Sequence, residues 1–366
     1  MEKINLAVLP GDNPGREMTC YAVQILEYIL QSCQLEYDIR YGEIGASAFE
    51  NTGSPLPGKT VEICRTSRAA LVGFVGSHRN YADLPFNMRP EAGLFNLRKK
   101  LGIFANIKRV KVEPQVFDLS PLKMDILQRG IDIAIVRELT GGIYYGKKGR
   151  CEVDGEPAAY DQEIYTEFEI ERVIRKAFSL AQTRRKSVVC ADKANLLETS
   201  QLWRKVGERV AREFPDTAFS CMYIDDLSAD IIRHPYRYDV IVANNMFGDI
   251  LSDEISAFSG AKSLIPTASF GQGNFGIYSP VAASFIDGTT RTSATMASSI
   301  LAVALMLRFS LSMPQQAGML EQAVYQTLET MRTQEIASQD RETVSDEILF
   351  HTIFDALKAT IDRHNF

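Results

Sequence analysis

Alternation between short apolar runs and amphipathic helical patterns constrains the fold of this chain more than any other feature. The apolar runs are rich in β-branched residues, as buried strands are. They occupy Ile4–Pro10, Ala69–Gly76, Ile131–Val136, Lys186–Asp192 and Tyr238–Ala243. The helical patterns cover Glu17–Leu30, Glu169–Arg185 and Ser200–Glu213. This alternation predicts an α/β fold with a largely parallel sheet.

Length and charge narrow the class of protein. The 366 residues exceed what one small core needs, so we expect two domains or one large α/β unit. A net charge of −6, with no block of Lys and Arg, argues against a nucleic-acid partner. The six cysteines show no paired spacing, which indicates reduced thiols of a cytosolic protein rather than a disulfide framework or a zinc site.

No segment reads as a membrane or secretion signal. The first ten residues lack the basic start and long apolar core of a signal peptide. The best membrane candidate lies between Arg291 and Arg308, which enclose 16 uncharged residues. A spanning helix needs about 20 mostly apolar residues, so this segment is better interpreted as a buried core helix. We expect a soluble cytoplasmic protein.

Two irregular segments carry separate predictions. Gly146–Glu163 is the least regular part of the chain and predicts a projecting loop or hairpin arm. Gly271–Gly276 reads GQGNFG and matches the GxGxxG spacing of dinucleotide sites. That fingerprint needs a helix directly after it and an acidic residue about 20 positions on. Pro280 and Met296 meet neither need, so we interpret the segment as a loop.

A helical stripe follows Pro90, which suits a first helical turn. Glu91, Leu94, Phe95 and Arg98 fall at i, i+3, i+4 and i+7, on one helix face. The stripe could be core packing with charged ends. It could equally be a pocket, with an apolar floor for an alkyl group and a guanidinium for a carboxylate. Spacing alone favours core packing.

Polar residues follow several of the apolar runs. They are Arg137, Tyr144, Lys193 and Asp225. Catalytic groups in α/β proteins collect at the carboxyl ends of strands, although a lysine in such a place is usually only solvated. The four histidines form no recognisable ligand pair.

Asp249 and Asp253 stand four residues apart in FGDILSDE, after Tyr238–Ala243. Mg²⁺ takes a few carboxylates and leaves positions for water and substrate, so these two with a third aspartate could hold it. The alternative is stabilisation of a helix start by Asp249, worth about 0.3–1 kcal/mol, with Asp253 merely solvated. Spacing alone favours this alternative.

The motifs, taken in order, resemble those of the β-decarboxylating dehydrogenases. They are LPGD, RPEAGLFNLRKK, FANI, LSPLK, VRELTGGIYYG, DKANLLE and NNMFGDILSDE, and they cover about the first three-quarters of the chain. The resemblance implies an α/β, non-Rossmann, isopropylmalate/isocitrate dehydrogenase-like two-domain fold with mixed sheets flanked by helices. Residues 1–103 and 261–366 would form the first domain, with the cofactor loop and both termini. Residues 104–260 would form a central domain with the dimer interface and the arm.

The resemblance also implies a metal and catalytic site shared between two subunits of a homodimer. Asp225, Asp249 and Asp253 would bind Mg²⁺ or Mn²⁺, and Lys193 and Tyr144 would be the catalytic pair. Asp225 and Lys193 would come from the partner subunit. Lys193 would take or relay the hydroxyl proton, and Tyr144 would reprotonate carbon.

Substrate and cofactor residues follow from the same resemblance. The residues that would bind the substrate carboxylates are Arg98, Lys108 and Arg137, and those that would hold its alkyl group are Glu91, Leu94 and Phe95. Asn195 and Asp287 would contact NAD. An apolar pocket favours an alkyl-malate, because an unpaired buried carboxylate is costly. The expected reaction is oxidative decarboxylation of (2R,3S)-3-isopropylmalate to 2-oxo-4-methylpentanoate with hydride transfer to NAD, in leucine biosynthesis.

Three segments depart from the family pattern. The glycine-rich GDGIGPE turn reads GDNPGRE at Gly11–Glu17, where Asn13 can tolerate a positive φ. A family arginine is replaced by Lys108, with Arg109 beside it. The adenosine loop reads SPVAASFIDGTTRTSATM at Ser279–Met296.

That loop has lost most of its family residues. Ala282, Ala283 and Thr295 replace the family His, Gly and Asn, and only Asp287 remains, where it would bind the ribose hydroxyls of NAD. These changes motivate two rival hypotheses: a decarboxylating dehydrogenase for a malate- or tartrate-type acid, and a non-catalytic paralogue with an impaired NAD site.

Overall fold

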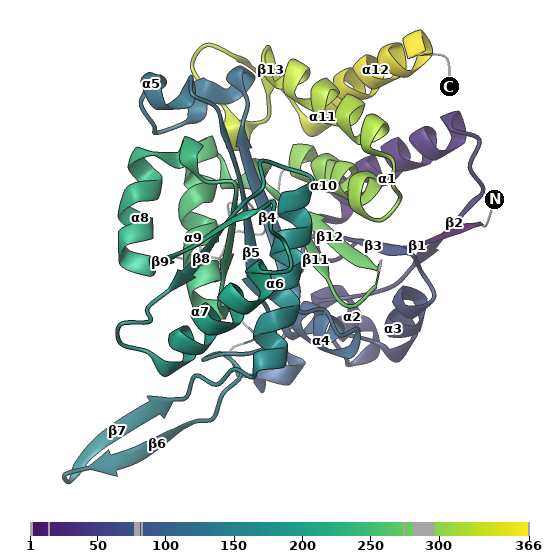
Figure 1. Cartoon of the computed structure of the whole chain (residues 1–366). Coiled ribbons are helices and arrows are strands. Elements are labelled where there is room, and N and C mark those ends of the chain that lie inside the picture. The colour runs from purple at the N-terminus through teal and green to yellow at the C-terminus, as the bar shows by residue number, and fades with distance from the viewer. Residues whose placement is uncertain are drawn as a thin grey trace. The chain divides into compact units, whose positions relative to one another are not determined.

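The computed structural model describes residues 3–13, 15–76, 81, 83–273, 275–280 and 296–364. The chain divides into two compact units. The terminal unit comprises Met1–Ile103, Glu113–Ser120 and Ser259–Phe366, and the central unit comprises Phe104–Val112 and Pro121–Phe258. Their elements are labelled in Figure 1. The chain therefore leaves the terminal unit, builds the central one and returns.

In the terminal unit, the strands of the large sheet lie in the order β2-β1-β3-β12-β11. Their bounds are β1 Ile4–Leu9, β2 Tyr37–Tyr41, β3 Ala69–Val72, β11 Pro266–Phe270 and β12 Gly276–Pro280. β1 pairs in parallel with β2 and β3, and β12 is parallel to β3 but antiparallel to β11. The glycine-rich segment at 271–276 thus connects two antiparallel strands, so its interpretation as a loop rather than a dinucleotide fingerprint is confirmed.

Helices cover this sheet, and their bounds are α1 Gly15–Ser32, α2 Ala46–Thr52, α3 Gly58–Arg65, α4 Ala92–Lys100, α10 Met296–Phe309, α11 Pro314–Leu328 and α12 Asp346–His364. Short elements are β13 Met331–Arg332, β14 Glu342–Thr343 and the 3₁₀ turns Phe86–Met88, Pro114–Leu119, Lys262–Leu264 and Gln334–Ile336. α10 is buried from Met296 to Leu307 and packs on α1 and α11, which confirms the predicted core helix. Among the described residues, no helix is both long and apolar enough to cross a membrane.

The turn after β1 is held by a buried carboxylate. Asp12 accepts hydrogen bonds from the backbone N–H groups of Ala46 at 2.9 Å, Ser47 at 2.8 Å and Gly76 at 2.9 Å. Gly11 has φ 75°, whereas Asn13 is not among the residues with positive φ. The positive φ at this turn is therefore supplied by the glycine before Asp12.

The central unit contains strands in the order β4-β5-β10-β8-β9. Their bounds are β4 Ala105–Val112, β5 Ile131–Glu138, β8 Ser187–Asp192, β9 Ala218–Tyr223 and β10 Val240–Ala243. β5, β10, β8 and β9 are parallel, and β4 is antiparallel to β5. The largely parallel sheet predicted from the sequence is therefore present here, with one antiparallel edge.

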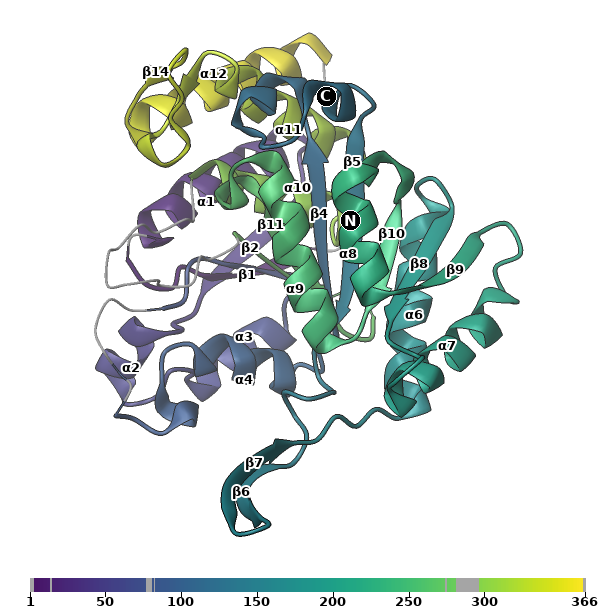
Figure 2. The ribbon, with the colours of Figure 1, turned by 90° about the vertical axis from the view of Figure 1, so that its left-hand side faces the viewer.

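Two pairs of helices cover the two faces of this sheet. Their bounds are α6 Glu167–Gln182, α7 Glu198–Ala211, α8 Ile224–Arg233 and α9 Asn245–Ser256, with short α5 at Met124–Leu127 and 3₁₀ turns at Pro235–Arg237 and Ala257–Ser259. α6 and α7 pack together on one face, and α8 and α9 lie on the other (Figures 1 and 2). Because helices cover both faces of the sheet, the carboxyl ends of its strands are not covered by these helices.

The predicted projecting segment forms a two-stranded arm (Figure 2). β6 Lys148–Val153 and β7 Glu156–Asp161 pair antiparallel and are largely exposed. Asp154 and Gly155 join them with φ of 54° and 81°. Two central residues with positive φ suit the right-handed twist of a tight hairpin.

Candidate active site

The carboxyl end of β5 gathers three of the predicted site residues. Arg137 is the penultimate residue of β5, and its Nη1 donates to Asp249 Oδ1 in an ion pair. Tyr144, in the loop that follows, donates its hydroxyl to Asp249 Oδ2 at 3.3 Å. The structure thus brings a guanidinium and a phenol to a carboxylate that is more than 100 positions away in sequence.

Asn245 orients this cluster and was missed in the sequence. Its Oδ1 accepts from Arg137 Nε at 3.0 Å and from Nη2 at 2.8 Å. Its Nδ2 donates to Gly141 O at 3.1 Å, and its backbone N–H donates to Tyr165 OH at 2.9 Å. The side chain is fully buried. The sequence feature that could have indicated this role is the Asn-Asn pair directly after an apolar strand, because an amide buried there needs hydrogen-bond partners.

Asp249 and Asp253 do share one helix face, but neither stabilises the helix start. Asn244 caps α9, and its side chain accepts from the backbone N–H of Phe247 at 2.7 Å. Asp249 lies in the second turn and Asp253 in the last one. A helix carries partial negative charge at its C-terminus, which disfavours a carboxylate there. The helix-end explanation is therefore wrong. Both side chains remain accessible, at 41% and 48% exposure.

Lys108 pairs with the second aspartate. Its Nζ lies 2.8 Å from Asp253 Oδ1, and the lysine is buried within β4. Side chains alternate along a strand, so the neighbouring Arg109 points to the other face. There it forms two hydrogen bonds to Asp132, at 2.8 and 2.7 Å. Arg109 therefore does not stand in for the arginine that Lys108 replaces.

Lys193 and Asp225 form a second cluster. Lys193 directly follows β8, Asp225 lies in the first turn of α8, and their side chains form an ion pair. Among the described residues of one chain, no group of three or more His, Cys, Asp or Glu side chains is placed to hold a metal. The structure contains one subunit, so the expected contribution of Asp225 and Lys193 to a partner's site stays a prediction.

Two pKa shifts follow from these contacts. The hydrogen bond from Lys193 holds the pKa of Asp225 below its usual value. Burial, and then the negative charge of Asp249, raise the pKa of Tyr144 above its usual value, against the opposing charge of Arg137. Tyr144 is therefore a protonated phenol at neutral pH and can donate a proton.

In the terminal unit, α4 presents the predicted stripe outside the core. The buried face of the helix consists of Ala92, Gly93 and Leu97. Leu94, Phe95 and Arg98 are half-buried, and Glu91 is exposed at the N-cap position. Other residues of the same helix therefore form its fully buried face, and the pocket interpretation of the stripe stays a prediction. An accessible apolar surface remains at Leu94 and Phe95.

The expected cofactor residues are placed only in part. Asn195 is exposed in the connection between β8 and α7. Asp287 lies outside the described residues, as do Ala282, Ala283 and Thr295. Their expected relation to NAD therefore stays a prediction.

Comparison with known proteins decides the family. The model of the isocitrate/isopropylmalate dehydrogenase family matches residues 5–350. This chain belongs to that family. It is 43% identical, over 94% of its length and 93% of the relative's, to 3-isopropylmalate dehydrogenase of Geobacillus kaustophilus. Its identity to the enzyme of the same name from Shouchella clausii is 40%, over 98% of both chains.

A solved structure of the same family agrees with the fold. The crystal structure of isocitrate dehydrogenase from Methylococcus capsulatus superposes with a TM-score of 0.78 at 26% identity, over 98% of this chain and all of that one. The predicted resemblance and the mixed α/β fold are thereby confirmed, and the chain is an enzyme of the dehydrogenase class.

Proposed function

We propose that this chain is a 3-isopropylmalate dehydrogenase, which oxidises and decarboxylates (2R,3S)-3-isopropylmalate to 2-oxo-4-methylpentanoate while hydride passes to NAD. The observation that carries the proposal is 40–43% identity, over nearly the whole chain, to two enzymes of that name. The reaction would serve leucine biosynthesis in the cytoplasm. The malate-type and non-catalytic alternatives gain no support from the comparisons.

The choice of an alkyl-malate rests on the accessible surface of α4. Leu94 and Phe95 would contact the isopropyl group, because they are apolar and half-buried without belonging to the core. Arg98 follows one turn later in α4, and its guanidinium would bind a carboxylate. Glu91 begins the same stripe. A carboxylate in place of the isopropyl group would meet an apolar surface, which is costly.

The aspartates fit a hard divalent cation such as Mg²⁺ or Mn²⁺. Asp249 and Asp253 offer carboxylate oxygens on one accessible helix face, with Arg137 and Lys108 beside them to receive the substrate carboxylates. Such oxygen ligands are those that Mg²⁺ prefers. Asp225 of the partner subunit would complete the set. The cation, when bound, supplies Lewis-acid stabilisation of negative charge that develops on substrate oxygen.

The chain's own residues would move the protons. Lys193 would accept, or relay, the hydroxyl proton of the substrate in its neutral amine form, and its contact with Asp225 positions the side chain. Tyr144 would deliver a proton to carbon after CO₂ has left, since its raised pKa keeps it protonated. Asn245 would hold Arg137 against the substrate. Asn195 and Asp287 would contact NAD.

A homodimer would bring the Lys193–Asp225 pair of one subunit to the cluster of Arg137, Tyr144 and Asp249 in its partner. Large apolar side chains remain exposed in the central unit, including Leu196 at 72% and Ile250 at 58%. Ile250 lies between Asp249 and Asp253 in sequence, and Leu196 follows Lys193 closely. Apolar exposure beside both clusters supports a subunit interface there. The exposed β6–β7 arm would extend the interface.

The test is an assay of NADH formation. Purified chain is incubated with NAD, Mg²⁺ and either 3-isopropylmalate or malate. We expect turnover of 3-isopropylmalate, dependence on the cation and little turnover of malate. Faster oxidation of malate would contradict the substrate assignment. Calorimetric titration with NAD in the presence of Mg²⁺ and substrate tests the cofactor, and absence of binding would support a non-catalytic paralogue.

A further inference from the structure

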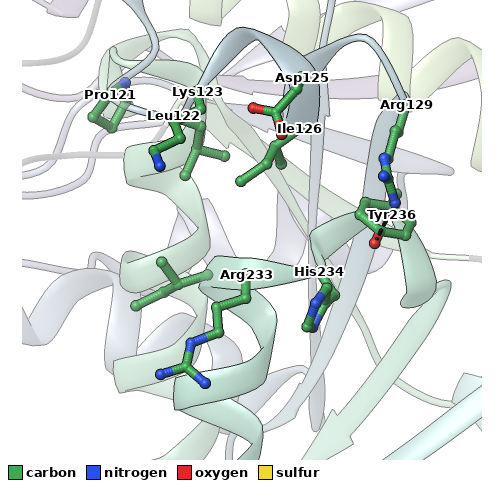
Figure 3. Close-up of a pocket in the computed structure, with 10 residues that line it drawn as sticks. Pro121, Leu122, Lys123, Asp125, Ile126, Arg129, Arg233, His234 and Tyr236 are labelled. Carbon is green, nitrogen blue, oxygen red and sulfur yellow. Dashed lines mark hydrogen bonds between the residues drawn. The ribbon is translucent and has the colours of Figure 1, made fainter.

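The central unit contains a pocket that none of the predicted site residues lines. Its volume is about 470 Å³, and it lies between the segment 121–129, which includes α5, and the segment 232–236 at the end of α8 (Figure 3). Pockets of this size accept small molecules. Asp225 stands in the first turn of α8 and Arg233 in its last, so roughly 12 Å of helix separate them. The pocket therefore lies away from the Lys193–Asp225 cluster, and none of the other predicted site residues lines it.

Positive charge predominates around the pocket. Lys123, Arg129 and Arg233 line it, and Asp125 is the one carboxylate among its lining residues. In the described part of the chain, no carboxylate forms an ion pair with any of these three cations. The whole chain has a net charge of −6, yet the lining of this pocket carries three cations and one carboxylate.

Local structure explains part of this arrangement. Arg233 ends α8, where a cation interacts favourably with the helix dipole. Arg129 Nη1 donates to Tyr236 OH at 2.6 Å, and its guanidinium lies 4.6 Å from the ring centroid. That contact uses one of five N–H donors and leaves the rest available. Lys123 has neither a helix-dipole contact nor, among the described residues, an aromatic partner that would explain its position. These local contacts also do not explain why all three cations line one pocket.

Apolar side chains complete the lining. Leu122 and Ile126 come from one side of the pocket, and Ile232 comes from the other. Ile232 is among the exposed large apolar residues of the chain. Apolar surface beside uncompensated cations suits a ligand with an apolar body and anionic groups. We propose that this pocket binds a small organic anion that carries phosphate or carboxylate groups on an apolar body.

Calorimetric titration of the full chain tests the proposal without reference to its catalytic activity. Phenyl phosphate and benzene-1,3,5-tricarboxylate are titrated separately at low ionic strength, without Mg²⁺. The variant K123Q/R233Q removes two pocket cations, both exposed, so the fold should persist. The control K205Q/R212Q makes the same change in charge at α7 and its C-cap, in the same unit. Circular dichroism checks that both fold.

We expect one of the two probes to bind once per chain with a dissociation constant below about 1 mM. The preferred probe identifies phosphate or carboxylate as the recognised group. The double variant K123Q/R233Q should bind it at least about tenfold more weakly, while the control binds it as the parent does. The absence of binding by both probes overturns the proposal, as does equal binding by the pocket variant. A changed assembly mass of K123Q/R233Q in ultracentrifugation also overturns it, because the pocket would then belong to a subunit contact.

Discussion

At the scale of single residues, the central unit separates side chains that are adjacent in sequence. Lys108 and Arg109 have the same charge but occupy opposite faces of β4, against Asp253 and Asp132. Asn244 caps α9, whereas Asn245 holds Arg137. These different partners lead to different expected effects of substitution.

Replacement of Asn245 by Ala should impair substrate binding more than folding. Arg137 would lose the acceptor of two of its three hydrogen bonds and keep only Asp249, and misplacement of a binding group by about 1 Å can cost about 100-fold in rate. We expect kcat/KM for 3-isopropylmalate to fall by about 10-fold to 100-fold, mainly through KM. Ser256→Ala is the control, since it removes a buried hydrogen bond of the same helix away from Arg137. Equal loss in both variants would show a merely structural role.

Lys108→Met should raise the KM for 3-isopropylmalate by about tenfold or more, because a substrate carboxylate loses its cation. Lys108→Arg should retain more activity than Lys108→Met, because it keeps the charge. Lys111→Met changes an exposed lysine of the same strand and serves as the matched control. Steady-state kinetics measure all three. An unchanged KM in Lys108→Met would remove Lys108 from the substrate site.

Asp132 makes stability depend on pH. Burial alone would raise its pKa, but Arg109 and Arg184 outweigh burial and lower the pKa from 3.8 to about 2. A lowered pKa means that this stabilisation is present above the ordinary pKa and is lost as the pH falls from 3.8 towards 2. We expect Asp132→Asn to cost about 1–2 kcal/mol at pH 7, after allowance for solvent screening.

Urea unfolding at several pH values measures this effect. The difference between the parent and Asp132→Asn should shrink as the pH falls below about 4. Asp216→Asn, an exposed position of the same unit, is the control and should show no such trend. A constant difference across the pH range would contradict the ion-pair origin of the stabilisation.

At the scale of elements, α9 presents both charged and apolar side chains outside the core. Its aspartates face the polar cluster, while Ile250 is exposed beside them. Ile250→Lys should convert the proposed dimer to monomers, since a charge without a partner would be buried at the contact. Activity should fall with dimerisation, because Lys193 and Asp225 would no longer reach a partner's site.

Sedimentation and activity, measured on the same samples, test this expectation. Ile348→Lys changes an equally accessible isoleucine of α12, in the terminal unit, and should affect neither measurement. A monomeric Ile250→Lys variant with full activity would exclude shared active sites.

At the scale of the whole molecule, shared sites predict complementation between inactive chains. Lys193→Met and Asp249→Asn should each be inactive alone. After the two are unfolded together and refolded in equal amounts, half of the dimers should be mixed, and each should hold one intact site of two. We therefore expect about a quarter of the parent activity. Recovery of no activity, with mixed dimers shown by mass spectrometry, would place both residues in the site of one chain.

Much of this molecule follows from local sequence pattern. Five of the strands and several of the helices, the β6–β7 arm and the buried α10 are visible as periodicity, turn residues and apolar length, because each depends on neighbours in sequence. The motifs determined the family as well, since they stand in order along most of the chain. The same patterns did not show which face of α4 contacts the core.

Only the tertiary structure decided what the polar residues contact. Spacing alone favoured helix-end electrostatics for Asp249 and Asp253, and the structure excludes it because Asn244 caps α9 and the helix begins at Asn245. Asn245 gained its role because β5 lies beside β10, which brings Arg137 within hydrogen-bond distance. Contacts between residues 100 or more positions apart depend on how strands are ordered in the sheet. Spacing along the chain does not encode the order of strands in the sheet. The sequence therefore predicted which residues form the site, and only the fold shows which side chains they contact.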